Sequence, residues 1–324
     1  MFCSSALAKA GQEFRSWKTE NGVETYFYEN HDVPMVDLRV SFRAGSIYDS
    51  KYHGLATLTA DMVYAGCGEY SAETLEDHFK SLGAQFSVNA SKEFARMQLR
   101  TLSTETALKP SLEAFQSCVS QPRFEEEYFV KAKEKQVMQI NMRKQSPQYL
   151  SWEAGIAKLY LTHPYGKQTL GSQDSVPLIT RQQVKQYFKK QYVREGASIV
   201  IVGDLTQEQA AKRAESLSKF MQHGTKPKLR DILKHPILPQ NVHRHFDGKQ
   251  TTVLLLRPGK QLTDKDYWPV QMASHIIGGG DGLTSLLAEK IRGEHGLVYA
   301  VFSGMFSYVD GPGAFYIQFQ TKND

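Results

Sequence analysis

The sequence RAGS at residues 43–46 follows a short β-type segment, and a related RPG at 257–259 returns 214 residues further along the chain. A second pair recurs at nearly the same distance, because GAQF at 83–86 matches GLVY at 296–299, 213 residues later. Near-equal offsets for two unrelated signals indicate an internal duplication. We therefore expect two homologous domains.

The residue patterns around these signals predict both strands and helices. β-Branched and aromatic residues predict strands, whereas apolar residues at helical spacing predict helices. In the first half we expect strands at 23–28, 36–42, 84–90, 94–102 and 197–202, and helices at 53–64, 74–82, 106–143 with a break at 121–122, 147–160, 181–192 and 206–220. In the second half we expect strands at 242–246, 251–257, 296–305 and 314–320, and helical segments at 264–277 and 283–291.

Three segments follow from this order. We assign residues 1–222 to an N-terminal domain and residues 241–324 to a C-terminal domain. The stretch 223–240 is the linker, because it holds Pro227, Pro236 and Pro239 with several lysines and no clear period. The second copy is shorter than the first by roughly 111 residues on the repeat spacing, so we expect an incomplete C-terminal domain.

Composition excludes several classes of protein. The chain has 324 residues, 41% hydrophobic and 23% charged, which is typical of a folded globular protein. The net charge of +5 comes from scattered lysines and arginines, so we expect no nucleic-acid partner. No apolar run approaches the ~18 residues of a membrane-spanning helix, so we expect no membrane span.

The cysteines and the N-terminus bear on location. Cys3, Cys67 and Cys118 are an odd, widely spaced set, which argues against a disulfide framework and against a cysteine zinc site. We expect three inert or buried thiols. The small-residue pattern at Ala8–Ala10 is of the kind that precedes a signal-peptidase cut. It indicates an exported, periplasmic protein; the alternative is a cytoplasmic protein with a frayed terminus.

Several motifs in order along the chain carry a family resemblance. They are RAGS at 43–46, HGLA at 53–56, HPYG at 163–166, VGD at 202–204 and GLVY at 296–299. This set resembles the pitrilysin and mitochondrial-processing-peptidase family of inverted zincins. The resemblance implies an α+β fold of two homologous domains, each an antiparallel sheet with packed helices, that close around an extended peptide. It also implies a two-chain bacterial enzyme in which one chain carries zinc.

The family's zinc motif, H-x-x-E-H, is absent where it should stand. In that motif two imidazoles at i and i+4 share one helix face and can bind one zinc ion, and the glutamate acts as general base. Here Thr57, Ala60 and Asp61 occupy these positions, and Gln139 occupies the position of the distant glutamate ligand. A hydroxyl, a methyl and an amide do not replace imidazole and carboxylate ligands. We expect no metal and no cofactor in this chain, and zinc only in a partner.

A second family feature is retained. The sequence IRGEHGLVY at 291–299 contains Arg292 and Tyr299, which the resemblance identifies as an arginine–tyrosine pair facing the zinc site from the opposite domain. Arginine can hold a peptide carbonyl or carboxylate, and a tyrosine hydroxyl can donate to a developing oxyanion. Without the family, the same two residues are a surface arginine and a core tyrosine.

The remaining histidines and glycines carry weaker signals. His53 begins a helix without a partner at i+4, and His163 caps or packs a turn. His243 and His245 would share a face of an edge strand. The glycines at 278–280 lack the Lys-Ser/Thr of a phosphate loop and instead predict a break between helices.

Two functions remain open on this evidence. The first is a non-catalytic subunit of a heterodimeric zinc peptidase that binds peptide and lends Arg292 and Tyr299 to a zinc-bearing homologous subunit. The second is a non-enzymatic peptide-binding or scaffold protein in which both residues are remnants. An active peptidase would require a tightly held zinc ion.

Overall fold

The computed structural model describes residues 14–228, 240–280 and 283–323. Within them the chain forms two compact units. The first contains residues 14–136 and 174–228, and the second contains residues 137–173 and 240–323. The predicted domain limits at 222 and 240 stay a prediction, and most of the predicted linker, like residues 1–13, lies outside the described residues.

The first unit is built on a six-stranded sheet with the strand order β1-β2-β8-β3-β7-β6. All neighbouring pairs are antiparallel except β2 and β8, which are parallel. Buried side chains alternate with more exposed ones along the strands, so one face of the sheet packs against the core. The strands are β1 (Arg15–Lys18), β2 (Glu24–Glu29), β3 (Met35–Phe42), β6 (Gln85–Ala90), β7 (Ala95–Leu102) and β8 (Ser198–Gly203).

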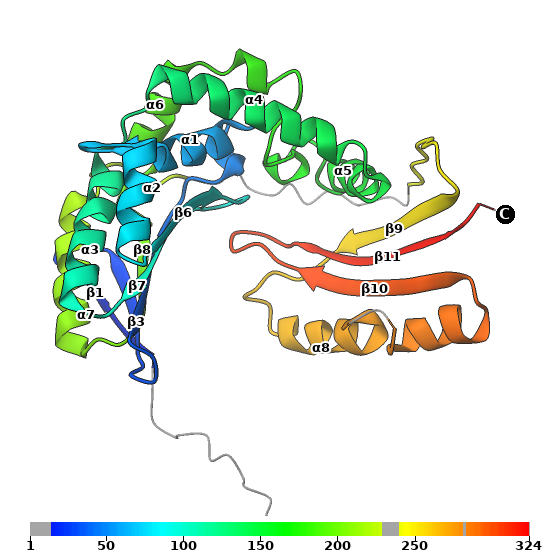
Figure 1. The fold of residues 1–324 in the computed structure, drawn as a ribbon. Coiled ribbons are helices and arrows are strands. Elements are labelled where there is room, and N and C mark those ends of the chain that lie inside the picture. Colours follow the sequence, from blue (N-terminus) through cyan, green and yellow to red (C-terminus); the bar gives the residue numbers. More distant parts are fainter. Residues whose placement is uncertain (1–13, 229–239, 281–282, 324) are drawn as a thin grey trace, which may run out of the picture. The chain divides into compact units, whose positions relative to one another are not determined.

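Helices of this unit lie on one side of the sheet (Figure 1). Side-chain caps begin three of them: Ser71 and Thr206 accept hydrogen bonds from the amides of Thr74 and Gln209, and Thr180 accepts one from the amide of Gln183. The helices are α1 (Leu55–Tyr64), α2 (Ala72–Ser81), α3 (Glu105–Ser120), α6 (Arg181–Gln191) and α7 (Gln207–Phe220), with short 3-10 turns at Ser46–Tyr48 and Val176–Leu178. Helix α4 (Glu126–Arg143) contributes residues to both units.

The second unit is a three-stranded antiparallel sheet with two helices packed on it. The strand order is β10 (Val298–Phe306), β11 (Ala314–Lys322), β9 (Gln250–Pro258). Helix α8 (Tyr267–Gly278) packs on β10, and α5 (Pro147–Tyr160) packs on β9. The remaining helical pieces are a 3-10 turn at Pro164–Gly166 and a π-type helical segment, η4, at Ala288–Glu294.

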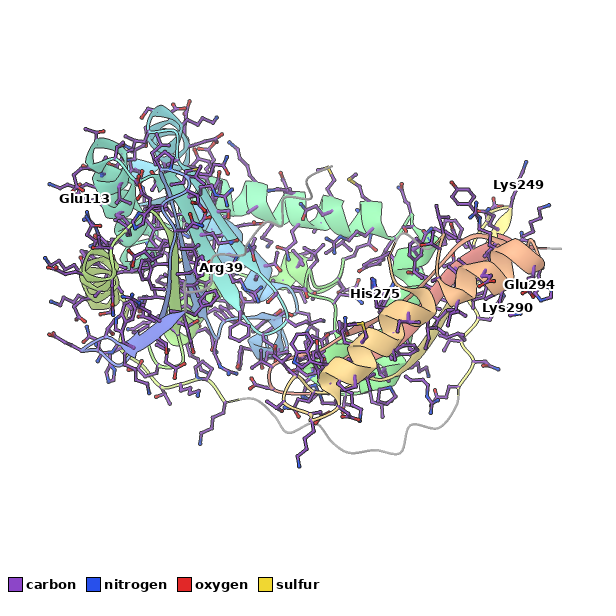
Figure 2. All side chains as sticks on the ribbon, turned by 90° about the horizontal axis from the view of Figure 1, so that it is seen from below. Arg39, Glu113, Lys249, His275, Lys290 and Glu294 are labelled. Carbon is purple, nitrogen blue, oxygen red and sulfur yellow. A yellow bond between two sulfur atoms is a disulfide. The ribbon has the colours of Figure 1, made fainter. Side chains whose placement is uncertain are left out.

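Specific polar contacts hold these helices. Ser303 Oγ in β10 donates to the Ser274 carbonyl in α8 at 2.7 Å, next to the buried Gly278. On α5, Trp152 Nε1 donates to Gln318 Oε1 in β11 at 3.2 Å. Tyr160 at the end of α5 donates through its hydroxyl to the Pro312 carbonyl at 2.9 Å. Figure 2 shows His275 on α8.

The two sheets share a local plan. In each unit a strand is followed by a closely packed glycine and then by a helix. Helix α1 follows β3 and packs on β6, and helix α8 follows β9 and packs on β10. Gly45 follows β3 and lies so close to the backbone of Lys92 and Glu93 that a Cβ would overlap it. Gly259 follows β9 and lies less tightly against the backbone of Ala314 at the start of β11, where a Cβ would come within 3.0 Å. The predicted duplication therefore has a structural counterpart.

Two predictions were wrong. Residues 242–246 form no strand, because β9 pairs with β11 and the segment holding His243 and His245 is exposed, with no apolar face to bury. The second error concerns the cysteines, because Cys67 and Cys118 form a disulfide.

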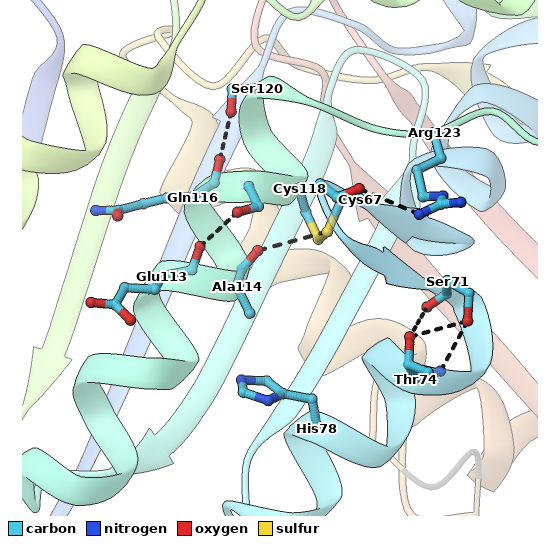
Figure 3. The surroundings of a disulfide bond; sticks show 12 residues. Cys67, Ser71, Thr74, His78, Glu113, Ala114, Gln116, Cys118, Ser120 and Arg123 are labelled. Atoms are coloured by element: carbon cyan, nitrogen blue, oxygen red, sulfur yellow. Dashed lines mark hydrogen bonds between the residues drawn. A yellow bond between two sulfur atoms is a disulfide. The ribbon is translucent and has the colours of Figure 1, made fainter.

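The disulfide joins the hairpin of β4 (Gly66–Cys67) and β5 (Tyr70–Ser71) to the end of α3 (Figure 3). Both half-cystines are fully buried, with their Cα atoms 4.8 Å apart. The backbone amide of Gly68 donates to the Gln121 carbonyl at 2.9 Å and keeps the hairpin against the helix end. The two cysteines are 51 positions apart in sequence, and the packing of α3 brings them together. Their spacing alone therefore could not predict the disulfide. Cys3 lies outside the described residues.

Candidate functional site

The start of helix α1, which carries the positions of the lost zinc motif, is fixed by Asp49. One carboxylate oxygen of Asp49 accepts a hydrogen bond from the Gly54 amide at 2.7 Å, and the other accepts one from the Ala56 amide at 2.8 Å. Gly54 has a φ of 100°, a conformation that glycine adopts without the steric cost of a Cβ. Asp49 therefore satisfies amide groups that the first turn of a helix leaves open.

Asp49 is buried, and burial is the main influence on its charge. Burial raises the pKa of Asp49 to about 8, while the backbone hydrogen bonds and Lys92 act in the opposite direction. Burial lowers the pKa of Lys92 to about 8, against the attraction of Asp49. Asp49 and Lys92 each favour the charged form of the other, against the effect of burial.

Two more segments of the first unit hold this turn. Gln136 Nε2 in α4 donates to the Gly54 carbonyl at 3.0 Å, and Ser175 Oγ donates to the His53 carbonyl at 2.7 Å. Sequence reasoning missed Asp49, Gln136 and Ser175. An aspartate five residues ahead of the helix could have been found as a capping residue, whereas the other two contacts join segments distant in sequence.

The residues at the positions of the zinc motif do not fit a zinc ion. On α1, Thr57 is half-buried and Ala60 is buried and carries no donor atom. Burial raises the pKa of Asp61, and the nearby positive charge of Lys135 opposes that shift. One carboxylate beside an ammonium group is a poor environment for a divalent cation, which needs several N, O or S ligands and repels a like charge.

The surroundings of Asp61 and the position of Gln139 agree with this. Burial and the Asp61 carboxylate both raise the pKa of Tyr192, so its buried hydroxyl stays protonated. Gln139 lies on α4, one helical turn beyond Lys135, and ends in a neutral amide. Within residues 14–228, 240–280 and 283–323, no three His, Cys, Asp or Glu side chains are grouped to hold a metal ion.

The structure brings Arg292 and Tyr299 together. Arg292 lies in η4, and the chain then turns through Gly296, whose φ is 64°, into β10. The amides of Gly296 and Leu297 donate to the carbonyls of Arg292 and Ile291, both at 3.0 Å, and close this turn. The Arg292 guanidinium carbon then lies 5.7 Å from the centroid of the Tyr299 ring, a cation–π arrangement.

Both side chains of this pair are open to solvent. Tyr299 is 78% exposed, so it is a surface residue and not a core tyrosine. The arginine fork and the phenol hydroxyl are therefore available together to a ligand. A role of the pair in catalysis stays a prediction. In the same segment, Lys290 and Glu294 form an exposed ion pair at 2.7 Å (Figure 2).

The histidines and glycines that the sequence analysis considered as weaker candidates lie outside this pair. His163 Nδ1 accepts a hydrogen bond from the Tyr165 amide at 3.3 Å, which confirms that it caps the turn. His243 and His245 are exposed. Gly278 ends α8 in contact with Ser303, as expected for a break after a helix. Residues 281–282 lie outside the described residues.

Comparison with known proteins places the whole arrangement in one family. Residues 26–173 match the family model "Insulinase (Peptidase family M16)", and residues 178–324 match the "Peptidase M16 inactive domain". The chain belongs to the peptidase M16 family. This confirms the resemblance to the pitrilysin and processing-peptidase group, and it confirms the predicted fold class.

Bacterial relatives of this M16 chain include proteins named for both active and inactive forms. It is 25% identical over 317 residues to an "uncharacterized zinc protease" of Rickettsia felis, covering 97% of this chain and 74% of the relative. It is also 25% identical over 287 residues to the "non-peptidase homolog YmxG" of Helicobacter pylori, covering 86% and 64%.

Solved structures agree with these matches. The M16 chain superposes on a peptidase M16 inactive domain from Pseudomonas fluorescens with a TM-score of 0.90 and 32% identity, covering 96% of this chain and 74% of that one. Pitrilysin shares the fold, with a TM-score of 0.73 at 16% identity, and the match covers 34% of its chain. Among the described residues of the M16 chain, no helix combines the length and apolar character needed to cross a bilayer.

Proposed function

We propose that this M16 chain is the non-catalytic subunit of a heterodimeric zinc peptidase. The supporting observation is a contrast between its two candidate sites. On α1, Thr57 and Asp61 occupy the positions of the two zinc-binding histidines and Ala60 occupies that of the general base, whereas Arg292 and Tyr299 lie side by side and exposed. A homologous zinc-bearing subunit is the partner, and a peptide is the substrate.

The chemistry of the pair suits a contribution to the partner's active site. The Arg292 guanidinium presents planar donors that can hold a peptide carbonyl or carboxylate. The Tyr299 hydroxyl can donate to the oxygen that gains negative charge when a peptide carbonyl is attacked. The partner supplies the zinc ion and the general base that this chain lacks.

Reconstitution tests the proposal. The chain is mixed with a zinc-bearing M16 subunit from the same source, and cleavage of an unstructured peptide is measured with each subunit alone and with both. We expect cleavage only by the mixture. Tyr299→Phe should lower kcat by roughly 100-fold, as for the loss of one oxyanion donor. Arg292→Ala, which removes a contact to the bound peptide, should raise KM by roughly tenfold.

Matched variants separate a catalytic effect from a loss of assembly. Arg257→Ala removes another exposed arginine of the same unit, and Tyr267→Phe removes another tyrosine hydroxyl. Both controls should leave the rate unchanged, and size-exclusion chromatography should show equal complex formation for all variants. Full activity of Arg292→Ala and Tyr299→Phe in an intact complex would instead favour the peptide-binding scaffold.

We also propose that the protein is exported to an oxidising compartment such as the periplasm. The buried Cys67–Cys118 disulfide supports this, because stable disulfides are rare in the cytosol. Fractionation of the native cells with a thiol-alkylating mass label tests it. A periplasmic protein whose Cys67 and Cys118 resist labelling is expected, and a cytoplasmic protein with both thiols labelled would contradict the proposal.

A further inference from the structure

The face of the six-stranded sheet that points away from the helices of its unit carries a set of mostly polar residues. The strand register arranges them in rows across β6, β7, β3 and β8. One row consists of Asn89, Arg96, Ser41 and Ser198; the neighbouring row consists of Ser87, Gln98, Arg39 and Val200. Arg39 stands directly opposite Gln98, so Arg96 is its diagonal neighbour. Arg39 is labelled in Figure 2.

The acidic groups on the paired strands of this face are already engaged elsewhere. Asp37 accepts two hydrogen bonds from Arg100, at 2.7 and 2.8 Å. Glu24 accepts one from the Tyr26 hydroxyl at 3.3 Å and lies 3.8 Å from Lys18. No carboxylate of these strands stands opposite Arg39 or Arg96 in the register.

Arg39 is held in place without being neutralised. Its Nε and Nη2 donate to the side-chain oxygen of Gln98 at 3.1 and 2.8 Å, in the amide orientation that satisfies both groups. A guanidinium group has five N–H donors, so the remaining donors can bind a ligand. The neutral Gln98 amide orients the charge but does not cancel it.

Arg96 is oriented by an aromatic ring. Its guanidinium carbon lies 5.6 Å from the centroid of Phe94, and Arg43 lies over the same ring at 5.4 Å. Burial and the neighbouring positive charge of Arg39 lower the pKa of Arg96, while Glu93 opposes that shift. Glu93 is only 5% exposed, so its carboxylate lies below the surface of this face. Two arginines that repel each other favour an anion placed between them.

We propose that this face binds acidic peptides, with carboxylates two residues apart held by Arg39 and Arg96. The inference rests on the proposed function and names its substrate class. Diagonal neighbours on adjacent strands are about 7–8 Å apart. Side chains at i and i+2 of an extended peptide point the same way and are about 6.6 Å apart. The polar residues around the two arginines can bind peptide groups between the carboxylates.

Direct binding to the whole chain tests the inference without any cleavage step. The probes are fluorescein-labelled nine-residue peptides of equal composition, with two glutamates at i and i+2 or at i and i+1. Two further probes replace the i, i+2 glutamates by glutamine or lysine. The i, i+2 glutamate peptide should bind tightest. Arg39→Gln and Arg96→Gln should each weaken it roughly tenfold, as for the loss of a hydrogen bond to a charged group.

A control variant of unchanged net charge and an oligothymidylate, used as a non-peptide anion, complete the design. Asp37→Asn/Arg100→Gln removes the neutral pair on the same face and should leave binding unchanged; circular dichroism and Tm verify that each variant is folded. Equal binding of the glutamine peptide, or unchanged binding by both arginine variants, would overturn the acidic specificity while leaving the proposed function standing. Equal binding of an oligothymidylate would overturn the peptide as ligand. Absence of binding to any peptide would contradict both proposals.

Discussion

The Arg292 guanidinium carbon lies 5.7 Å from the centroid of the Tyr299 ring, and the tyrosine is 78% exposed. A cation–π contact at an exposed site is worth about 0.5–1 kcal/mol. Neither side chain is needed to fill a core, so the fold gives little reason for the pair to be present.

Replacing Tyr299 by alanine should therefore lower the free energy of unfolding by less than about 1 kcal/mol. Urea denaturation of the single chain measures this. Val301→Ala, a fully buried position in the same strand, is the contrast and should cost more, because it leaves a cavity. A large loss for Tyr299→Ala would mean that the pair is structural.

Removal of divalent metal should leave the stability of the chain unchanged. The start of α1 is held by Asp49 and Gln136, and the neighbouring carboxylate Asp61 lies near the positive charge of Lys135. Thermal unfolding is measured before and after dialysis against EDTA, with elemental analysis for zinc. A fall in Tm that added zinc reverses would disprove the prediction.

Reduction of the disulfide should destabilise the first unit. The crosslink joins residues 51 positions apart and lowers the conformational entropy of the unfolded chain. By loop-closure entropy this raises the free energy of unfolding by about 4 kcal/mol. The Cys67→Ser/Cys118→Ser variant should show the same loss as the reduced protein in denaturant unfolding, and Cys3→Ser should show none. Equal stability of the double variant and the oxidised protein would contradict the crosslink.

His31 should titrate above the usual range for histidine. Its Nδ1 lies 2.6 Å from Asp204 Oδ1, and its Nε2 lies 3.0 Å from Glu29 Oε1. The hydrogen bond to Asp204 is the main cause that raises the pKa of His31, and the same contact lowers the pKa of Asp204. The protonated histidine therefore stabilises the fold fully below about pH 6.5, and this contribution is lost as the pH rises through the folded pKa.

NMR titration of the His31 ring measures this. Asp204→Asn should bring the pKa back toward 6.5, and Glu29→Gln should lower it by a smaller amount. An unchanged titration curve in Asp204→Asn would show that the contact does not form in solution.

Gly278 should be intolerant of a side chain. A Cβ at this position would lie 2.8 Å from the Ser303 amide nitrogen and 2.9 Å from its Cβ, so α8 would have to move off β10. Gly278→Ala should lower the free energy of unfolding by roughly 1–3 kcal/mol, as overpacking usually does. Ala273→Ser, on the exposed side of the same helix, should be neutral in the same denaturation experiment.

The sequence predicted much of the fold, because local patterns specify local structure. The break predicted at 121–122 is confirmed, because Pro122 lies between the end of α3 and the start of α4. The short strand β1 was missed, because four residues give too little periodicity. The strand expected at 242–246 was wrong because alternation alone does not supply a partner strand.

The candidate sites divide in the same way. The motif identified Arg292 and Tyr299, and the turn at Gly296 explains why residues seven apart meet. The disulfide depends on an α3 position far from β4 in sequence. The rows that place Arg96 beside Arg39 depend on strand register, which no local pattern of either strand reveals.

The contacts of Asp49, Gln136 and Ser175 around the start of α1 have a consequence for biosynthesis. These three groups are encoded in the polypeptide, so we expect the nascent chain to mature without waiting for an ion to be delivered. Cellular amounts of this protein should then stay level under zinc starvation, when a metal-dependent relative would be depleted.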